Sequence, residues 1–140
     1  MNIDEKIKIL GLTPLVQEKI KMIDFICYKD DLNPNNYSVD TIFLDDLVGT
    51  YRSHECNLST NWLTYLEQTR KGIFFETYKN RNCDFERFLL QPTQEEIDQY
   101  GLPEVVKIEK GYLIYEQGKH RLTIAKLLGI EAAKVIVHRY

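Results

Sequence analysis

The sequence predicts a single α/β domain, and three observations lead to this fold class. The chain of 140 residues is near the usual size of one domain and can bury one real core. It carries nine Tyr, a residue that suits small α/β or α+β domains because one end of the ring is buried and the other is wet. Its C-terminal third reads as a regular series of strand, glycine turn, helix and strand.

The first 30 residues are expected to be helical. Gly11 is a plausible C-cap for a first helix, and Thr13 is a plausible N-cap for a second one. Apolar residues at helical spacing support both helices: Ile3, Ile7 and Leu10, then Leu15, Ile20, Ile23 and Ile26. A dense Asn/Asp/Pro turn cluster follows at 30–36. We therefore divide the chain into a helical N-terminal extension, residues 1–36, and a main domain, residues 37–140.

The middle of the chain is predicted to begin with a strand at 38–44. Asp45 and Asp46 follow it, where carboxylates can hold Mg²⁺ near phosphates, although a solvated turn is the favoured interpretation. Arg52 and His54 are expected in a loop. A long helix should begin at 59 or 60 and bury one side, formed by Trp62, Leu63, Leu66, Ile73 and Phe74. The pattern of residues 79–91 assigns no element.

The C-terminal third gives the clearest local signals. Thr93 and Glu96 have the spacing of a capping box, which predicts a short helix that ends at Gly101. Strands are predicted at 105–108 and 112–115, joined by a hairpin turn at 109–111. A tight turn at 117–120, a helix at 121–128 and a last strand at 135–137 complete the domain. His138 is expected to be exposed and without a role.

The turn at Gly118 is the candidate functional site. A glycine can adopt backbone angles closed to other residues, and the first N–H groups of the following helix make an anion site. Lys119, His120 and Arg121 add positive charge or donors, and Thr123 adds a hydroxyl. The competing interpretation is an ordinary glycine turn with solvated basic residues, since a lone glycine turn is a weaker signal than a complete Walker-type loop.

Residues 111–130, GYLIYEQGKHRLTIAKLLGI, resemble the ParB/sulfiredoxin superfamily. Its members share a strand, an Asp/Gly-Gly-x-His/Arg-Arg turn, a helix of the pattern l-x-A-x-x-L-G and a final strand, here at 133–137. The similarity covers residues 93–138 well and reaches weakly to 38–53. It implies a compact α/β fold, a mixed sheet with flanking helices, that binds nucleotide phosphates at this turn. An arginine of the family that faces the nucleotide would correspond to Arg52.

The branches of this superfamily differ in chemistry, and the turn separates them. Sulfiredoxins need a cysteine where this chain has Lys119, so sulfiredoxin activity is not expected. The free-serine kinase branch has an acid at the position of Gln117, and Glu116 is displaced by one residue. ParB proteins carry a helix-turn-helix region for DNA, which we expect to be missing because the chain ends ten residues after Ile130.

The resemblance gives a first hypothesis of a nucleotide-binding protein, an NTPase or phosphotransferase. It would take a nucleoside triphosphate or diphosphate with Mg²⁺ as companion. The phosphates would lie at residues 118–121, Thr123 and Arg52, with His120 and Glu116 as catalytic candidates. One alternative is a non-catalytic regulatory module that binds nucleic acid or a protein. Another is a ParB-like nuclease, although no clear metal-ligand cluster supports it.

The amino-acid composition bears on the class of protein and on the cellular compartment in which this site would occur. The formal net charge of −3 argues against a protein that coats DNA. The three cysteines, Cys27, Cys56 and Cys83, are scattered and odd in number, which is typical of reduced thiols. No secretory signal and no run of about 20 apolar residues is visible. We therefore expect a cytoplasmic protein without membrane contact; its oligomeric state is left open.

Overall fold

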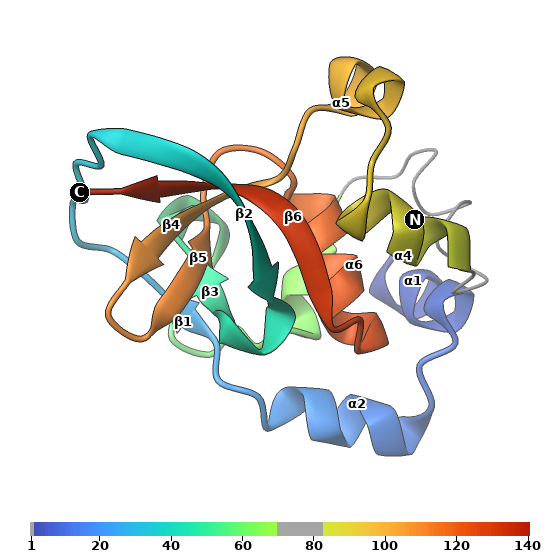
Figure 1. Ribbon diagram of the computed structural model, residues 1–140. Helices are drawn as coiled ribbons and strands as arrows, with labels where there is room; N and C mark the ends of the chain where they lie inside the picture. The colour runs from blue at the N-terminus through green and yellow to red at the C-terminus, as the bar shows by residue number, and fades with distance from the viewer. Residues whose placement is uncertain (1, 70–82) are drawn as a thin grey trace.

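The computed structural model describes residues 2–69 and 83–140, which form a mixed α/β fold around a six-stranded sheet (Figure 1). The strands are β1 (Ile26–Cys27), β2 (Asn36–Phe43), β3 (Leu47–Thr50), β4 (Glu104–Ile108), β5 (Gly111–Ile114) and β6 (Ala132–Arg139). The α-helices in these ranges are α1 (Ile3–Leu10), α2 (Pro14–Lys21), α4 (Cys83–Leu90), α5 (Gln94–Tyr100) and α6 (Lys119–Leu128). The predicted α/β class is confirmed at this level.

The sheet has the strand order β1-β3-β5-β4-β6-β2 and mixes parallel with antiparallel pairs. Strands β1, β3 and β5 run parallel to one another. Strand β4 is antiparallel to β5 and parallel to β6, and β2 pairs antiparallel with β6 along its whole length. The edge strand β2 exposes Tyr37, Val39 and Phe43.

One face of the sheet carries the hydrophobic core. Val105, Ile114 and Val137 project from β4, β5 and β6 into it, and all three are fully buried. Helix α6 packs on this face with Leu122 and Ala125, as the sequence predicts. Figure 1 shows α1, α4 and α6 gathered on the same side of the sheet.

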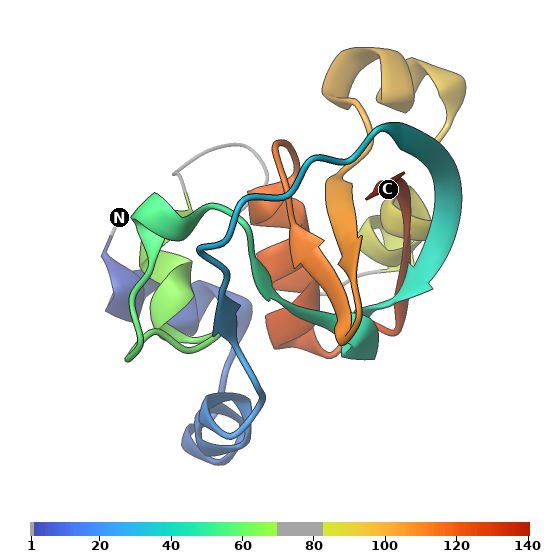
Figure 2. The same cartoon turned by 90° about the vertical axis from the view of Figure 1, so that its left-hand side faces the viewer.

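The N-terminal region is helical only in part. Helices α1 and α2 are confirmed, with Asn2 and Thr13 as N-caps and Gly11 as a left-handed C-cap. The second helix, however, ends at Lys21, so the prediction of a helix that includes Ile26 is wrong. Residues Ile26 and Cys27 instead form β1, which lies beside β3 (Figure 2).

The close approach of β1 to β3 has a simple cause. A Cβ atom at Gly49 would lie 2.0 Å from the backbone oxygen of Ile26, so only glycine permits the pairing. Leu10, Leu12 and Ile20 of the N-terminal region also belong to the core cluster. Within the described residues, the segment 2–36 is thus packed against the rest of the chain at several points.

The predicted long helix from 59 or 60 is wrong within the described residues. A 3-10 helix occupies Thr64–Gln68, and turns precede it. The side chain of Asn57 accepts from the backbone N–H of Ser59, and that of Asn61 accepts from Thr64. Such local bonds offer the backbone an alternative to an α-helix. Trp62, Leu63 and Leu66 are buried as predicted, whereas Ile73 and Phe74 lie outside the described residues.

The C-terminal elements are confirmed, with ends shifted by one to three residues. Helix α6 begins at Lys119 and not at Arg121, and the last strand covers Ala132–Arg139. The capping box of α5 is present in both directions. In the stretch 79–91 the structure contains α4, while residues 79–82 lie outside the described part.

The expectation of three reduced cysteines is wrong for one pair. Cys27, at the end of β1, and Cys56 form a disulfide, with Cα atoms 5.9 Å apart. Sequence spacing does not reveal it because the sheet brings the two residues together from positions 29 apart. Among the helices of the described ranges, none has the length and apolar character needed to cross a bilayer.

Candidate functional site

The candidate site lies where two neighbouring parallel strands end. Strands β3 and β5 run parallel, so the segments that follow them leave the sheet at the same edge. After β3 the chain passes through Tyr51 and Arg52 into a 3-10 helix, Ser53–Glu55. After β5 it makes the turn at Gly118 and enters α6. The sheet therefore brings Arg52 to the predicted turn.

The turn itself has the predicted geometry. Gly118 is left-handed, with φ of 89°, and it is the N-cap of α6. A Cβ atom there would lie 2.4 Å from Cβ of Pro103, so the position excludes larger residues for two reasons. The N–H of Leu122 is the first to bond within the helix, to the carbonyl of Gly118. The N–H groups of residues 119–121 therefore cannot be paired by the helix itself.

A buried carboxylate, Glu55, links the loop after β3 to the first turn of α6. Its Oε2 accepts from Lys119 Nζ at 2.5 Å, and its Oε1 accepts from Arg52 Nε at 2.7 Å. Oε1 also accepts from the hydroxyl of Tyr65 at 2.9 Å. We call these four residues the Glu55 network. The side chains of Glu55 and Lys119 are only 9% and 10% exposed, so this is a largely desolvated ion pair.

The pKa values in this network follow from burial and hydrogen bonding. Burial raises the pKa of Glu55, but the bonds from Arg52, Lys119 and Tyr65 outweigh it and leave the pKa below the usual range. Burial raises the pKa of Tyr65, and its bond to the Glu55 carboxylate adds to this. Glu55 is therefore ionised at neutral pH and Tyr65 is a neutral donor.

Arg121 and Thr123 are turned into the protein. The Arg121 guanidinium donates to the carbonyls of Tyr100 and Gly101 at 3.0 and 2.9 Å, where α5 ends. It also lies over the ring of Phe88. Thr123 is fully buried, and its hydroxyl has no hydrogen-bond partner among the described residues. Both residues lie below the turn and not on its outer side.

The other predicted residues are near the surface. His120 is the second residue of α6 and is half-buried. Glu116 is exposed, and its backbone carbonyl accepts from Arg52 Nη1 at 2.9 Å. Arg52 thus ties the loop after β3 to the turn after β5 with the same guanidinium that contacts Glu55.

A pocket of about 300 Å³ lies between these two segments. Arg52 and Glu116, both predicted, are part of its lining. The lining residues come from the loop after β3 and from the end of β5: Tyr51, Arg52, Ser53, His54, Tyr115 and Glu116. The rings of Tyr51 and Tyr115 stack, with centroids 5.6 Å apart and planes at 25°.

Sequence reasoning missed Glu55, Tyr51 and Tyr115. Glu55 stands three residues after Arg52, a spacing that places two side chains on one side of a helical turn and could have indicated the pair. The two tyrosines become neighbours only because β3 pairs with β5, and β3 was not predicted. Without that strand, the loop after it had no defined position.

Asp45 and Asp46 do not belong to the site. They are exposed in a 3-10 helix, Leu44–Asp46, before β3, whereas Arg52 follows this strand. Strand β3, which is four residues or about 13 Å long, lies between Asp46 and Tyr51. In the described part of the chain, no group of three or more His, Cys, Asp or Glu side chains is placed to hold a metal ion. Glu116 supplies a carboxylate at the pocket itself.

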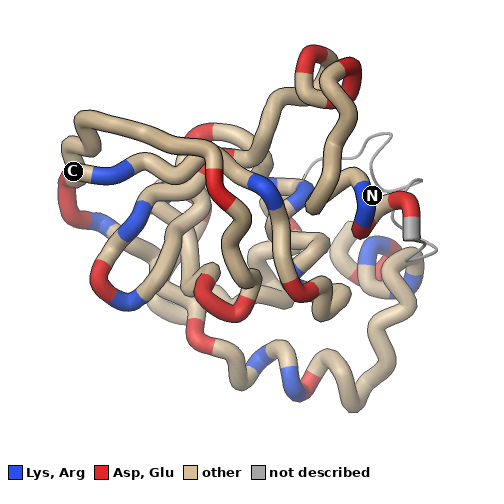
Figure 3. The backbone as a smooth tube through the Cα atoms, in the orientation of Figure 1, with Lys and Arg blue, Asp and Glu red and all other residues tan. Residues whose placement is uncertain are grey.

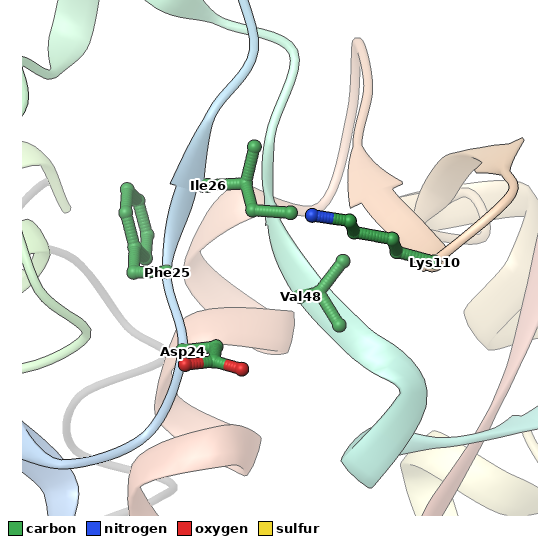
Figure 4. Close-up of a pocket in the computed structure, with 5 residues that line it drawn as sticks. All are labelled: Asp24, Phe25, Ile26, Val48 and Lys110. Atoms are coloured by element: carbon green, nitrogen blue, oxygen red, sulfur yellow. The ribbon is translucent and has the colours of Figure 1, made fainter.

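A second, larger cavity of about 520 Å³ lies elsewhere on the sheet. It is lined by Asp24, Phe25, Ile26, Val48 and Lys110, and Figure 4 shows Lys110 reaching from the β4–β5 turn toward Ile26. None of these residues belongs to the predicted site. Figure 3 shows basic and acidic residues interspersed along the described chain.

Comparison with known proteins gives no relative from which to take a function. No family model matches the chain, and no curated protein and no solved structure is similar to it.

Proposed function

We propose that this protein binds a nucleotide, with the phosphates between Arg52 and the first turn of α6. The observation that supports this most is the position of the pocket. It lies at the carboxyl edge of two parallel strands, and Arg52 and Glu116 line it. The ten-residue helix α6 begins three residues after Glu116. In open α/β sheets, ligands bind at this edge, and helix N-termini favour anions.

The described residues divide into distinct roles in this proposal. The dipole of α6 favours an anion at the turn. Arg52 already bonds Glu55 and the Glu116 carbonyl and offers its remaining N–H groups to phosphate oxygens. Lys119 adds positive charge while Glu55 holds it in place. Arg121 and Thr123 support the turn from inside. His120 is the candidate general acid or base, since histidine titrates near neutral pH.

The nucleotide is a di- or triphosphate accompanied by Mg²⁺. Magnesium is usually held by one or two carboxylates together with substrate phosphates. Glu116 lines the pocket and provides such a carboxylate. When bound, the ion would neutralise phosphate charge; the chain itself would orient the phosphates through Arg52 and the helix turn.

We also infer that the fold is of the ParB/sulfiredoxin kind. The order of strand, glycine turn, helix and strand over residues 111–139 supports this, because it is the order of that superfamily's signature. A cytoplasmic location stays part of the proposal. The Cys27–Cys56 disulfide, a bond typical of oxidising compartments, speaks against it, and the redox state of the pair in cells tests it.

A thermal-shift titration tests the nucleotide proposal. ATP, ADP, CTP and GTP are added separately with Mg²⁺ while the melting temperature is followed. A nucleotide that binds only the folded state at ten times its Kd adds about 1.4 kcal/mol to the free energy of unfolding. No shift with any of the four at millimolar concentration overturns the proposal.

Paired arginine variants locate the binding site. Arg52→Gln should remove most of the nucleotide-dependent shift. Arg139→Gln is the matched control, because Arg139 also makes an ion pair, with Asp40 of the edge strand β2, and is not part of the lining of this pocket. Equal shifts in the two variants would place the nucleotide elsewhere.

A non-catalytic binding module is the alternative that one observation favours. Glu55 accepts from both Lys119 and Arg52, so this carboxylate serves as their counter-ion and not as a catalytic base. Release of inorganic phosphate from the bound nucleotide separates an NTPase from a binder. Incubation with plasmid and single-stranded DNA, with and without divalent metal, tests the nuclease alternative.

A further inference from the structure

Five aromatic side chains form a continuous row across the sheet. The ring centroids of Tyr28 and Tyr51 are 6.0 Å apart, and those of Tyr51 and Tyr115 are 5.6 Å apart. From Tyr115 the row continues to His138 at 4.7 Å and from there to Tyr37 at 5.9 Å. We call these residues the aromatic row.

The row follows the order of the strands. Tyr28, Tyr51 and Tyr115 stand directly after β1, β3 and β5, and His138 and Tyr37 lie in β6 and β2. Strand β4 supplies Glu104, whose carboxylate bonds the ring of His138 at 2.7 Å. The prediction that His138 is exposed is therefore wrong, since its side chain is only 19% exposed and is held by Glu104.

The row lies on the face of the sheet opposite to the core. The residues that precede Tyr51, Tyr115 and His138 by one position are Thr50, Ile114 and Val137, and all three are fully buried. Successive side chains of a strand point to opposite faces. Tyr37 is 70% exposed, whereas Val106 and Leu113, which also point to this side, are fully buried. The other four rings of the row are half-buried, so this face is open to solvent only in part.

The row and the proposed phosphate pocket share two residues. Tyr51 and Tyr115 line the pocket together with Arg52. Ring faces bind nucleobases by stacking, at about 1–3 kcal/mol per base, and do so with little dependence on the base. A strand with one phosphate at Arg52 would therefore have its following bases over the rings. Neighbouring ring centroids of the row are 4.7 to 6.0 Å apart. A row of this length suits about four nucleotides, which is the smallest site size known for single-strand binding by OB-folds.

Both basic and acidic side chains adjoin the aromatic row, and this mixture determines which interactions can supply the affinity for a nucleic acid. Arg52 adjoins Tyr51, whereas Glu116 adjoins Tyr115 and Glu104 contacts His138. Affinity must then come from stacking more than from neutralised phosphates. For single strands each neutralised phosphate contributes a slope of about −0.7 to log K against log salt, so we expect a total slope near −1.

We propose that the aromatic row is a base-stacking surface for single-stranded nucleic acid, continuous with the phosphate pocket. This inference rests on the proposed function, because the pocket that takes the phosphates of a free nucleotide would also take one phosphate of a strand. It names the ligand class as an oligonucleotide of about four or more residues.

Fluorescence anisotropy with two labelled oligonucleotides tests the role of the bases. One probe is a hexathymidylate, and the other has the same backbone without bases. We expect the base-containing probe to bind at least tenfold more tightly, since several stacked bases are lost in the other. Equal affinities for the two probes would overturn the proposal.

Two variants of β2 test the row away from the pocket. Tyr37→Ala should weaken hexathymidylate binding about 5- to 150-fold, while Tyr37→Phe, which keeps the ring, should retain it. Phe43→Ala is the matched control: Phe43 is 59% exposed at the other end of the same strand, outside the row. An unchanged affinity for Tyr37→Ala contradicts the row. Circular dichroism melting checks that each variant is folded.

The two proposals fail in different ways. If mononucleotides raise the melting temperature but the hexamer binds no better than a mononucleotide, the proposal of a base-stacking row is overturned and the proposal of a phosphate pocket is supported. If the hexamer binds in a Tyr37-dependent way while mononucleotides give no shift, the row stands and the separate phosphate pocket is overturned. Absence of both effects overturns both.

Discussion

At the scale of single residues, the site is governed by one carboxylate. Glu55 collects donors from three different parts of the chain: the loop after β3, the 3-10 helix at 64–68 and the start of α6. A buried ion pair contributes little net stability, but loss of one partner leaves an uncompensated charge. The effect of a substitution therefore depends on whether the partner is removed as well.

Glu55→Gln should lower the free energy of unfolding by about 3 kcal/mol, because Lys119 then lacks its counter-charge in a largely desolvated position. Lys119→Met alone should cost a similar amount. The double variant should lose less than the sum of the two, with a coupling of about 0.5–3 kcal/mol. Urea unfolding of the four proteins measures the cycle, and strict additivity would show that the pair is not coupled.

Gly118→Ala should be more destabilising than Gly129→Ala. Both glycines are left-handed, with φ of 89° and 72°, so each substitution costs about 1–2 kcal/mol in backbone strain. Only Gly118 faces a close neighbour, Pro103, whereas the space around Gly129 is open to 4 Å. Denaturant unfolding should rank the variants in that order; the reverse order would mean that the turn moves away from Pro103 freely.

The turn residues illustrate what local sequence can and cannot predict. Gly118 as a left-handed cap follows from its place between a strand and a helix, and the structure confirms it. The partners of Lys119 and Arg121 do not follow, because Glu55 and the end of α5 are remote in sequence. Local patterns fix backbone conformation, but ion-pair partners depend on the tertiary fold.

At the scale of elements, most of the differences between prediction and structure come from two strands that were not predicted, β1 and β3. β1 and β3 are short, so neither shows a periodic pattern that could be told from a loop. Their parallel pairing joins segments that are distant in sequence. The long helix predicted from 59 or 60 failed for the opposite reason: apolar spacing suggested it, but Asn57 and Asn61 bond locally.

The disulfide fixes β1 to the segment that carries Arg52 and Glu55. Closing a loop of this length contributes about 3–4 kcal/mol in the chain-entropy model. A reductant should therefore lower the melting temperature of the protein, and weaken nucleotide binding by loosening residues 51–56. The double variant Cys27→Ser/Cys56→Ser should be insensitive to the reductant. Equal sensitivity of both proteins would point to another cause.

Helix α5 is held at its C-terminal end by Arg121. Hydrogen bonds from a charged donor contribute about 1.5–3 kcal/mol each, and Arg121 makes two to the carbonyls there. Arg121→Gln should speed amide hydrogen exchange in 94–100 by tenfold or more, relative to β4–β6. A uniform change across the whole protein would instead indicate a global loss of stability.

At the scale of the whole molecule, the ionisable groups determine whether the free energy of unfolding rises or falls with pH. The pKa of Glu96 is lowered from 4.5 to about 2, chiefly by its bonds from Arg87, and that of Glu55 is lowered too. Below pH 4.5 the unfolded chain takes up these protons before the folded one does. The stability that these groups provide is therefore complete above 4.5 and is lost as the pH falls through the folded values.

Urea unfolding at pH 6 and at pH 2.5 tests this dependence. The protein should be less stable at pH 2.5. Glu96→Gln should reduce the difference by up to about 1 kcal/mol, since the pair with Arg87 is partly exposed and screened. Stability that is independent of pH in this range would contradict the assignment.

Two buried lysines affect the free energy of unfolding at alkaline pH. Burial lowers the pKa of Lys6 and of Lys126, so the folded state releases these protons before the unfolded state does. As the pH rises toward 10.5, their contribution to stability should increase. Lys126→Met should flatten this rise.

The pairing of β2 with β6 has a consequence for the order of synthesis. Asn36 pairs with Arg139 and Phe43 with Ala132, so the entire ladder joins residues made far apart in time. Until residues 132–139 leave the ribosome, β2 has no neighbour in this sheet, and Ile42, which is buried in the folded protein, has no paired strand beside it. Pairings that must wait in this way are slow and prone to misassembly. A nascent chain of this protein is thus most vulnerable just before its final strand is translated.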